Sequence, residues 1–242
     1  MSRSRSIARV TGMIMAAHLL AACDDGGGTA ADAGDADSDT ATEGSSTVTA
    51  TVRLVDAVGG GAPQGATVTF DGDPVEVEGE TATGEVPAEA PFELLAEATG
   101  YADYMLNGRA GQSDFTLTSF VSSRSTTDYV MGSLGMSVDA SKGFVVVGVD
   151  TPALEPVVGA RVEIGSDHDD PFVFAGSTPQ LGDTIPDGGA SFVSFPNVEP
   201  GTASIAVTPP DGLSCAVFPG PGELSEIEVY ADRVSVISYT CQ

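Results

Sequence analysis

The protein is a chain of 242 residues with 35 acidic and nine basic side chains, which gives a formal net charge of −26 at pH 7. Such a charge repels a phosphate backbone, so the composition excludes nucleic-acid binding through a basic surface. It also argues against adhesion to anionic lipids through a polybasic patch. We therefore expect any membrane attachment to come from a covalently bound lipid.

The first 22 residues have the pattern of an export signal. Arg3, Arg5 and Arg9 precede a mostly apolar run, Val10–Ala22, that is too short for a mature membrane anchor. The next residue is Cys23, and the sequence Leu-Ala-Ala-Cys that it completes resembles the lipobox of bacterial lipoproteins. This resemblance implies that residues 1–22 are removed and that Cys23 carries a lipid. The alternative is an ordinary signal peptide followed by a cysteine by chance.

Residues 23–46 are predicted to be an acidic, disordered tether. The segment 24–46 holds seven carboxylates, no basic residue and no large apolar side chain, so it cannot offset the entropy of ordering by burial. Removal of the signal also takes away three of the nine basic residues, and the mature chain has a formal net charge of about −29. We expect a lipid-anchored protein of the cell envelope, on the periplasmic or extracellular face.

A strand-like alternation of apolar and polar residues begins at residue 47. Val48, Ala50, Val52 and Leu54 alternate with polar residues, as in a strand with one buried face. Similar runs follow, separated by turn sequences. The further strands expected before residue 126 are Ala66–Asp71, Pro74–Glu78, Phe92–Thr99, Tyr101–Leu106 and Asp114–Val121.

Residues 126–142 are predicted to link two β domains. Thr126–Met136 is the only fair helix candidate, but Gly132 and Gly135 weaken it, so a short helix and an irregular link both fit. A second series of strands begins at residue 143. Its expected members are Phe144–Asp150, Ala160–Gly165, Pro171–Ala175, Ala190–Phe195, Thr202–Thr208, Leu213–Phe218, Ser225–Tyr230 and Val234–Cys241. These short strands predict an all-β fold of two antiparallel Greek-key β-sandwiches, at 47–125 and 143–242.

The two series of strands have related sequences. Val52–Asp56 and Gly65–Val68 align with Val146–Asp150 and Gly159–Val162, and both alignments have the same offset of 94 residues. A duplication explains a shared offset most simply, although few of the aligned residues are identical and a chance match is the alternative.

These motifs carry a resemblance to a known family. The second unit has Gly159-Ala160-Arg161-Val162, then Gly188–Phe192, then Pro200-Gly201 before an alternating strand. This order resembles that of carboxypeptidase regulatory-like domains, which are seven-stranded, transthyretin-like β-sandwiches. The first unit matches less fully, through Gly65–Val68 and Gly100-Tyr101. The resemblance implies a fold and an accessory role, and it supplies no catalytic residue.

Two cysteines remain once Cys23 is assigned to a lipid. Cys215 and Cys241 form an even pair in an exported chain, where a disulfide is the default expectation. The bond closes a loop of about 27 residues and is expected to stabilise the fold by about 3.5 kcal/mol. A metal site needs more ligands than these two thiols, and none lie nearby in sequence.

One acidic segment could support chemistry. His168 is the one histidine after the export signal, and it lies among Asp167, Asp169 and Asp170. The three carboxylates are candidate ligands for weak Ca²⁺ binding, and His168 is a candidate base. A solvated loop closed by Pro171 has the same composition.

The sequence therefore favours a non-enzymatic, lipid-anchored cell-envelope protein that acts as a spacer or interaction module. Its expected partners are the membrane, through the lipid on Cys23, and a protein or polysaccharide, with no nucleic acid. The alternative function is a calcium- or glycan-binding surface protein that uses the acidic loops Asp167–Asp170 and Asp183–Asp187. Calcium is the only cofactor that the sequence suggests.

Overall fold

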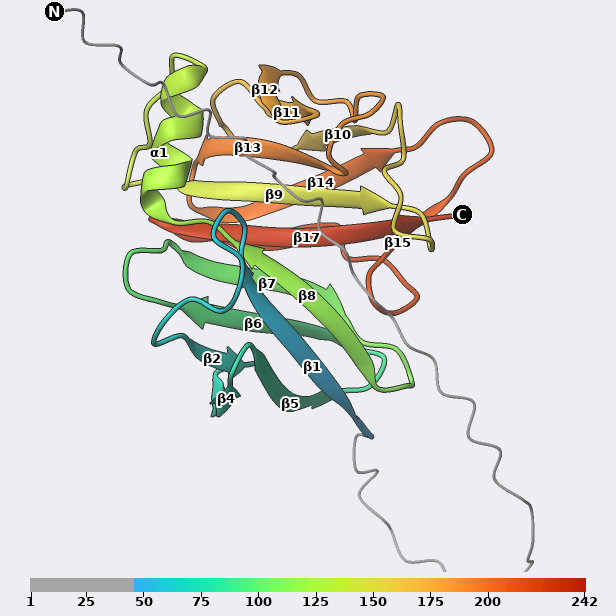
Figure 1. Ribbon diagram of the computed structural model, residues 1–242. Coiled ribbons are helices and arrows are strands. Elements are labelled where there is room, and N and C mark those ends of the chain that lie inside the picture. Colours follow the sequence, from blue (N-terminus) through green and yellow to red (C-terminus); the bar gives the residue numbers. More distant parts are fainter. Residues whose placement is uncertain (1–45) are drawn as a thin grey trace, which may run out of the picture.

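The structure is a computed structural model that describes residues 46–242 (Figure 1). The predicted export signal, the candidate lipidation site Cys23 and nearly all of the predicted tether lie outside the described residues. The described chain folds into strands and one helix, and the all-β sandwich fold expected from the sequence is confirmed. No helix within residues 46–242 has the length and apolar character needed to cross a membrane.

The first unit contains eight strands. They are β1 (Thr47–Asp56), β2 (Thr67–Phe70), β3 (Asp73–Val75), β4 (Val77–Glu78), β5 (Thr81–Pro87), β6 (Pro91–Glu97), β7 (Asp103–Arg109) and β8 (Phe115–Val121). One sheet has the order β4-β5-β1-β8, and β3-β2-β6-β7 run along part of a second sheet. Val52, Leu54, Phe92 and Leu94 are fully or nearly fully buried in the core between these two layers.

The second unit contains nine strands. They are β9 (Gly143–Asp150), β10 (Arg161–Ile164), β11 (Phe172–Ala175), β12 (Thr178–Leu181), β13 (Phe192–Val198), β14 (Gly201–Thr208), β15 (Cys215–Val217), β16 (Glu226–Val229) and β17 (Arg233–Cys241). A small sheet of order β10-β14-β16 faces the strands β12-β11-β13-β9-β17, and β15 pairs with β17. Val145, Val147, Phe195 and Ile237 lie in the core between them.

The two units share one topology, as a duplication predicts. In each unit the first strand pairs in parallel with the last strand, β1 with β8 and β9 with β17. On its other side the first strand pairs antiparallel, β1 with β5 and β9 with β13. The bounds of β2, Thr67–Phe70, and of β10, Arg161–Ile164, differ by the same 94 residues as the sequence motifs.

The expectation of two separate sandwiches is wrong. β7 of the first unit pairs in parallel with β17 of the second, with Asp103 opposite Arg233 and Asn107 opposite Ile237. One ten-stranded sheet therefore runs through both units. The physical reason is that β7 and β17 would otherwise both be sheet edges with unpaired backbone groups, and their pairing satisfies both edges.

The expectation of purely antiparallel sheets also needs correction. The β1–β8, β9–β17 and β7–β17 pairs are all parallel. Parallel neighbours need a long connection between them, and here each last strand returns beside the first strand of its unit after the chain has built the opposite sheet.

The two smaller sheets cover opposite faces of the ten-stranded sheet. Tyr104 and Leu106 of β7 pack on the first core, and their register partners Val234 and Val236 on β17 therefore face the same way. Ile237, the next residue after Val236, points instead into the second core. Figure 1 shows β1 and β8 on the near side of β7 and β6, with β10 and β14 behind β9 and β13. The near face of β13-β9-β17 is therefore left without a covering sheet.

The helix α1 (Arg124–Ser133) packs on part of that face. It overlaps the predicted helix at 126–136. Of the two forms expected for the linker, a short helix or an irregular link, the helix is therefore confirmed. Its N-cap is Ser123, whose hydroxyl accepts a hydrogen bond from the Thr126 N–H. Gly135, with φ of 76°, ends it in a left-handed conformation that suits glycine. Met131 is fully buried in a small cluster with Phe172 and Phe174.

Candidate functional site

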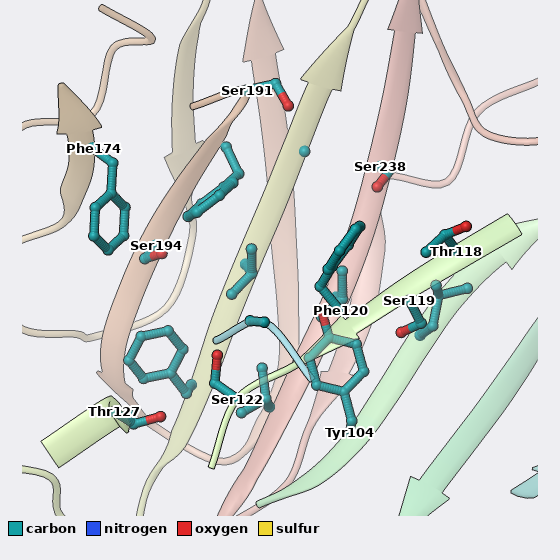
Figure 2. Close-up of a pocket in the computed structure, with 18 of the residues that line it drawn as sticks. Tyr104, Thr118, Ser119, Phe120, Ser122, Thr127, Phe174, Ser191, Ser194 and Ser238 are labelled. Atoms are coloured by element: carbon teal, nitrogen blue, oxygen red, sulfur yellow. The ribbon is translucent and has the colours of Figure 1, made fainter. Parts of the chain in front are cut away.

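A cavity of about 180 Å³ lies between the two units. Its floor is the uncovered face of β13, β9 and β17, and its walls come from β7, β8, α1 and the turn that follows β1. Figure 2 shows Phe174 and Ser194 on one side of the cavity and Thr118, Ser119 and Phe120 on the other. The cavity therefore exists only because the units are joined in one sheet.

The lining combines aromatic rings with hydroxyl groups. Eight serine and threonine side chains line the cavity, among them Ser122, Ser191 and Ser238 (Figure 2). The aromatic side chains are Tyr104, Phe120, Phe144, Phe172, Phe174, Phe192 and Phe218. Such a mixture of apolar surface with a few polar groups is typical of ligand pockets.

The rings on the α1 side form a packed wall. Phe172 contacts Phe174 and Phe144 edge to face, with ring centroids 5.8 Å and 6.1 Å apart. Phe174 contacts Phe192 in the same manner at 5.7 Å. Edge-to-face packing fixes ring orientation, so this side of the cavity is preformed.

Asp150 is the one ionisable side chain in the lining other than the phenol of Tyr104. It is the last residue of β9 and is only 4% exposed. Its counterpart at the offset of 94 residues is Asp56, the last residue of β1. Both units thus end their first strand in an aspartate beside the junction.

Asp56 shapes the mouth of the cavity. Its carboxylate accepts hydrogen bonds from the backbone N–H groups of Val58 (2.8 Å) and Gly59 (2.6 Å) and from the Tyr101 hydroxyl. Burial alone would raise the pKa of Asp56, but these hydrogen bonds to the charged form hold it below its usual value. The turn that they fix places Ala57 and Val58 in the cavity wall. Val58 is 58% exposed and therefore lies at the mouth rather than inside.

Two polar side chains of β7 line the unit junction. The Asn107 side-chain amide donates to the Val236 carbonyl of β17 at 3.3 Å, in a buried position. Burial raises the pKa of the Tyr104 phenol far above its usual value, and the hydroxyl of Ser119 lowers it by a smaller amount. Tyr104 therefore stays neutral at physiological pH, and the junction side of the lining carries no formal charge.

The cysteine pair predicted from the sequence is joined. Cys215 and Cys241 form a disulfide, and they are also opposite each other in the β15–β17 pair. The bond fastens the last strand one residue before the C-terminal Gln242. It lies at the far end of β17 from Arg233 and contributes no residue to the cavity.

The structure does not assemble the candidate calcium ligands. Asp167, Asp169 and Asp170 are exposed, and within residues 46–242 no three acidic, histidine or cysteine side chains form a group that could hold a metal ion. The Asp169 carboxylate instead accepts a hydrogen bond of 2.7 Å from the Asn197 amide. The second acidic loop is engaged too, because Asp183 forms an ion pair with Arg161 at 2.8 Å.

His168 packs against a residue of the second core. Its ring packs edge to face on Phe195 with centroids 5.1 Å apart, and its Nδ1 lies 2.5 Å from the Asp169 carbonyl oxygen. It is absent from the cavity lining. The His168 ring and the Asp169 carboxylate thus contact other residues of the protein, and calcium binding by this loop stays a prediction.

The sequence did not predict the cavity, although one pattern is typical of its floor. Phe144–Val149 is an unbroken apolar run apart from Gly148, and such a run indicates a strand buried on both faces. One face of β9 builds the second core, and the other is the cavity floor. No sequence pattern predicted the cavity walls. Residues of β7 and β8 lie near those of β9 only because β7 pairs with β17 and so joins the two units.

No protein-family model matches the chain, and no curated protein matches it. The resemblance to carboxypeptidase regulatory-like domains therefore stays a prediction.

Several solved structures are similar in part. The Bacillus anthracis TIE protein shares 11% identity over 81% of this chain and 34% of that chain, with a TM-score of 0.26, so this chain spans about a third of it. A streptococcal ancillary pilin shares 10% identity over 81% of this chain and 69% of that chain, with a TM-score of 0.27. The CBMbc module (family CBM26) of Eubacterium rectale Amy13K, solved with maltoheptaose, shares 9% identity over 81% and 96%, with a TM-score of 0.26. TM-scores this low do not bear on function.

Proposed function

We propose that the protein is a non-enzymatic, lipid-anchored interaction module of the cell envelope, and that the cavity between its units is the interaction site. The observation that carries this proposal is the chemistry of the lining. The cavity offers rings and hydroxyls, but its lining includes no histidine, lysine, arginine or cysteine. A serine or threonine nucleophile needs an adjacent base, and the one carboxylate of the lining, Asp150, is buried and already interacts within the protein, so these hydroxyls suit binding rather than catalysis.

The path of the chain supports a role in presentation. β1 begins at Thr47, directly after the predicted tether, and its ten residues span about 33 Å at roughly 3.3 Å per residue. It ends at Asp56, beside the cavity mouth. Figure 1 shows β1 running from the outer end of the first unit towards the second. An anchor on Cys23 would therefore hold the first unit near the membrane and the cavity farther out.

The shared sheet supports a preformed site. The cavity floor and the wall formed by β7 are strands of one ten-stranded sheet, and sites built on such elements are held more precisely than sites on loops. A module of this kind needs no rearrangement of its units to bind.

The anchor is tested by replacing the predicted lipidation site. In the exporting cell, Cys23→Ser in the full-length chain should move the protein from the membrane fraction to the soluble fraction in detergent phase partitioning, because one covalent lipid group supplies the membrane affinity. Asp24→Asn is the matched control, since it changes the adjacent residue and leaves the cysteine in place. Membrane retention of the Cys23→Ser protein would contradict the proposal.

A further inference from the structure

We infer that the cavity between the units binds a neutral, apolar ligand about the size of one aromatic ring, with room for one hydroxyl group on that ring. This inference rests on the proposed function, in which the cavity is the interaction site, and names the class of ligand that the site takes.

The volume of the cavity sets the size of the ligand. At about 180 Å³ it is smaller than pockets for drug-sized molecules, which measure about 300–1,000 Å³. It is close to an engineered apolar protein cavity of about 150 Å³ that binds benzene. A single substituted ring therefore fits within the cavity.

The aromatic wall sets the chemistry of the ligand. Phe144, Phe172, Phe174 and Phe192 hold one another in fixed edge-to-face contacts. Aromatic pairs prefer offset or edge-to-face geometry, and rings that are already ordered lose little entropy when a further ring joins them. A planar ring is therefore better matched to this wall than a flexible chain.

Electrostatics exclude a charged ligand. An anion would meet no basic side chain in the lining, would lie near the Asp150 carboxylate, and would enter a chain of net charge −26. A cation would lose its hydration in a mostly apolar cavity. Asp150 is only 4% exposed and already interacts within the protein, so little of its carboxylate is accessible to a ligand.

The floor allows one polar substituent. Ser191, Ser194 and Ser238 come from β17 and from β13 and the residue before it, and their hydroxyls both donate and accept hydrogen bonds. Gly148 lies between them on β9, and a Cβ there would come within 2.8 Å of the Ser238 Oγ. The glycine therefore keeps this serine accessible from the cavity.

Entry to the cavity has a structural basis. Val58, at the mouth, is followed by Gly59, Gly60 and Gly61, and the last two have positive φ values of 66° and 74°. A run of three glycines gives the turn more conformational freedom than any other residue type would. These glycines let the turn open at the cost of the hydrogen bonds that Val58, Gly59 and Gly60 donate to Asp56.

The test uses the mature chain with Cys23→Ser, so that no acyl chain is attached, and measures thermal unfolding with small probes. Toluene and p-cresol should raise Tm progressively with concentration, because a ligand of the native state stabilises it by linkage. Benzoate and benzylamine, of similar size but charged, should leave Tm unchanged at the same concentrations and ionic strength. No shift with either neutral probe, or an equal shift with all four, would overturn the inference.

Variants locate the binding. Thr118→Phe on β8 places a ring in the cavity and should abolish the toluene shift, whereas Thr116→Phe on the same face of β8, exposed and outside the lining, should retain it. Ser194→Leu fills the cavity from the floor and serves as a second test that does not depend on the folding of Thr118→Phe. A toluene shift that persists in both filled variants would show that the ring binds elsewhere. A negative result in these Tm measurements would not change the detergent partitioning of the Cys23→Ser protein. The ligand class and the membrane anchor are therefore tested separately.

Discussion

Asp56 and Asp150 occupy equivalent positions in the two units but have different environments. Asp56 is partly exposed and accepts hydrogen bonds from the turn that follows it, whereas Asp150 is buried and lines the cavity. The sequence repeat predicted that both first strands end in aspartate. It could not predict their environments, because burial at the junction depends on the neighbouring unit rather than on the local sequence.

Replacing Asp56 should loosen the mouth of the cavity. At pH 7, Asp56→Asn should lower the free energy of unfolding by about 1–3 kcal/mol, because hydrogen bonds to a charged group are lost. The pKa of Asp56 is lowered in the folded state, so the folded state binds fewer protons than the unfolded state near that pKa. The contribution is therefore complete above the unfolded pKa of about 4 and disappears as pH falls through the folded pKa.

The measurement is urea unfolding of both proteins at pH 7, 5 and 3. The difference in unfolding free energy between the parent and Asp56→Asn should be present at pH 7 and 5 and should shrink towards pH 3. Asp211→Asn, at an exposed loop position, is the control and should show no such difference. A difference that is constant across this range would mean that the charge of Asp56 is not responsible.

At the scale of elements, strands with large apolar residues were predicted well and strands with small ones were not. β1, β6 and β14 lie within about two residues of their predicted bounds. β5 was missed, although Ala82, Gly84 and Val86 alternate along it. These side chains are too small to signal a core face.

The small residue in β5 is required by packing. A Cβ on Gly84 would come within 2.5 Å of the Phe70 ring, which is only 2% exposed and belongs to the facing sheet. The apolar bulk at this position is thus supplied by Phe70, whose strand β2 was predicted. Where a small residue on one strand packs against a large residue on the facing strand, the strand with the small residue shows little apolar periodicity. It is therefore not predicted from the sequence pattern.

Gly84→Ala should therefore destabilise the first core. We expect a loss of about 1–3 kcal/mol in the free energy of unfolding, because the added methyl group would force the buried Phe70 ring to shift within the core. Gly132→Ala in α1 is the matched control, since no atom lies within 4 Å of the added Cβ. That variant should keep its stability or gain up to about 1 kcal/mol. The measurement is denaturant unfolding of the two variants and the parent protein. If Gly84→Ala were as stable as Gly132→Ala, the packing argument would be contradicted.

At the scale of the whole molecule, the sequence predicted two related units but not the sheet that they share. Alternation tells which face of a strand is buried, and the repeat tells which elements correspond. Neither the alternation nor the repeat tells which sheet edges pair with each other. Edge strands pair through backbone groups, which are nearly the same in every residue, so the pairing depends on how the folded units fit together. The junction cavity was hidden for the same reason, and with it the site that the proposed function uses.

The shared sheet implies that the two units unfold together. Five consecutive residue pairs join β7 to β17, and the buried Asn107–Val236 hydrogen bond lies among them. Ion pairs add to the junction, where Arg233 of β17 meets Asp103 of β7 at 3.5 Å. Unfolding either unit alone would leave one of these strands with an unpaired edge and would expose the apolar cavity floor to water. Both losses oppose a partly folded state.

Native-state hydrogen exchange of the mature chain in increasing urea tests this coupling. The slowest amides of β1 in the first unit and of β14 in the second should report the same free energy of opening and the same dependence on urea, as one cooperative body requires. Leu106→Pro in β7 should separate the two values, because proline removes a backbone N–H from a central strand. Thr116→Pro on β8, outside the junction pairing, is the control: it should destabilise the first unit without creating a separate, more stable second unit. Different opening energies for β1 and β14 in the parent protein would show instead that the units are independent despite their common sheet.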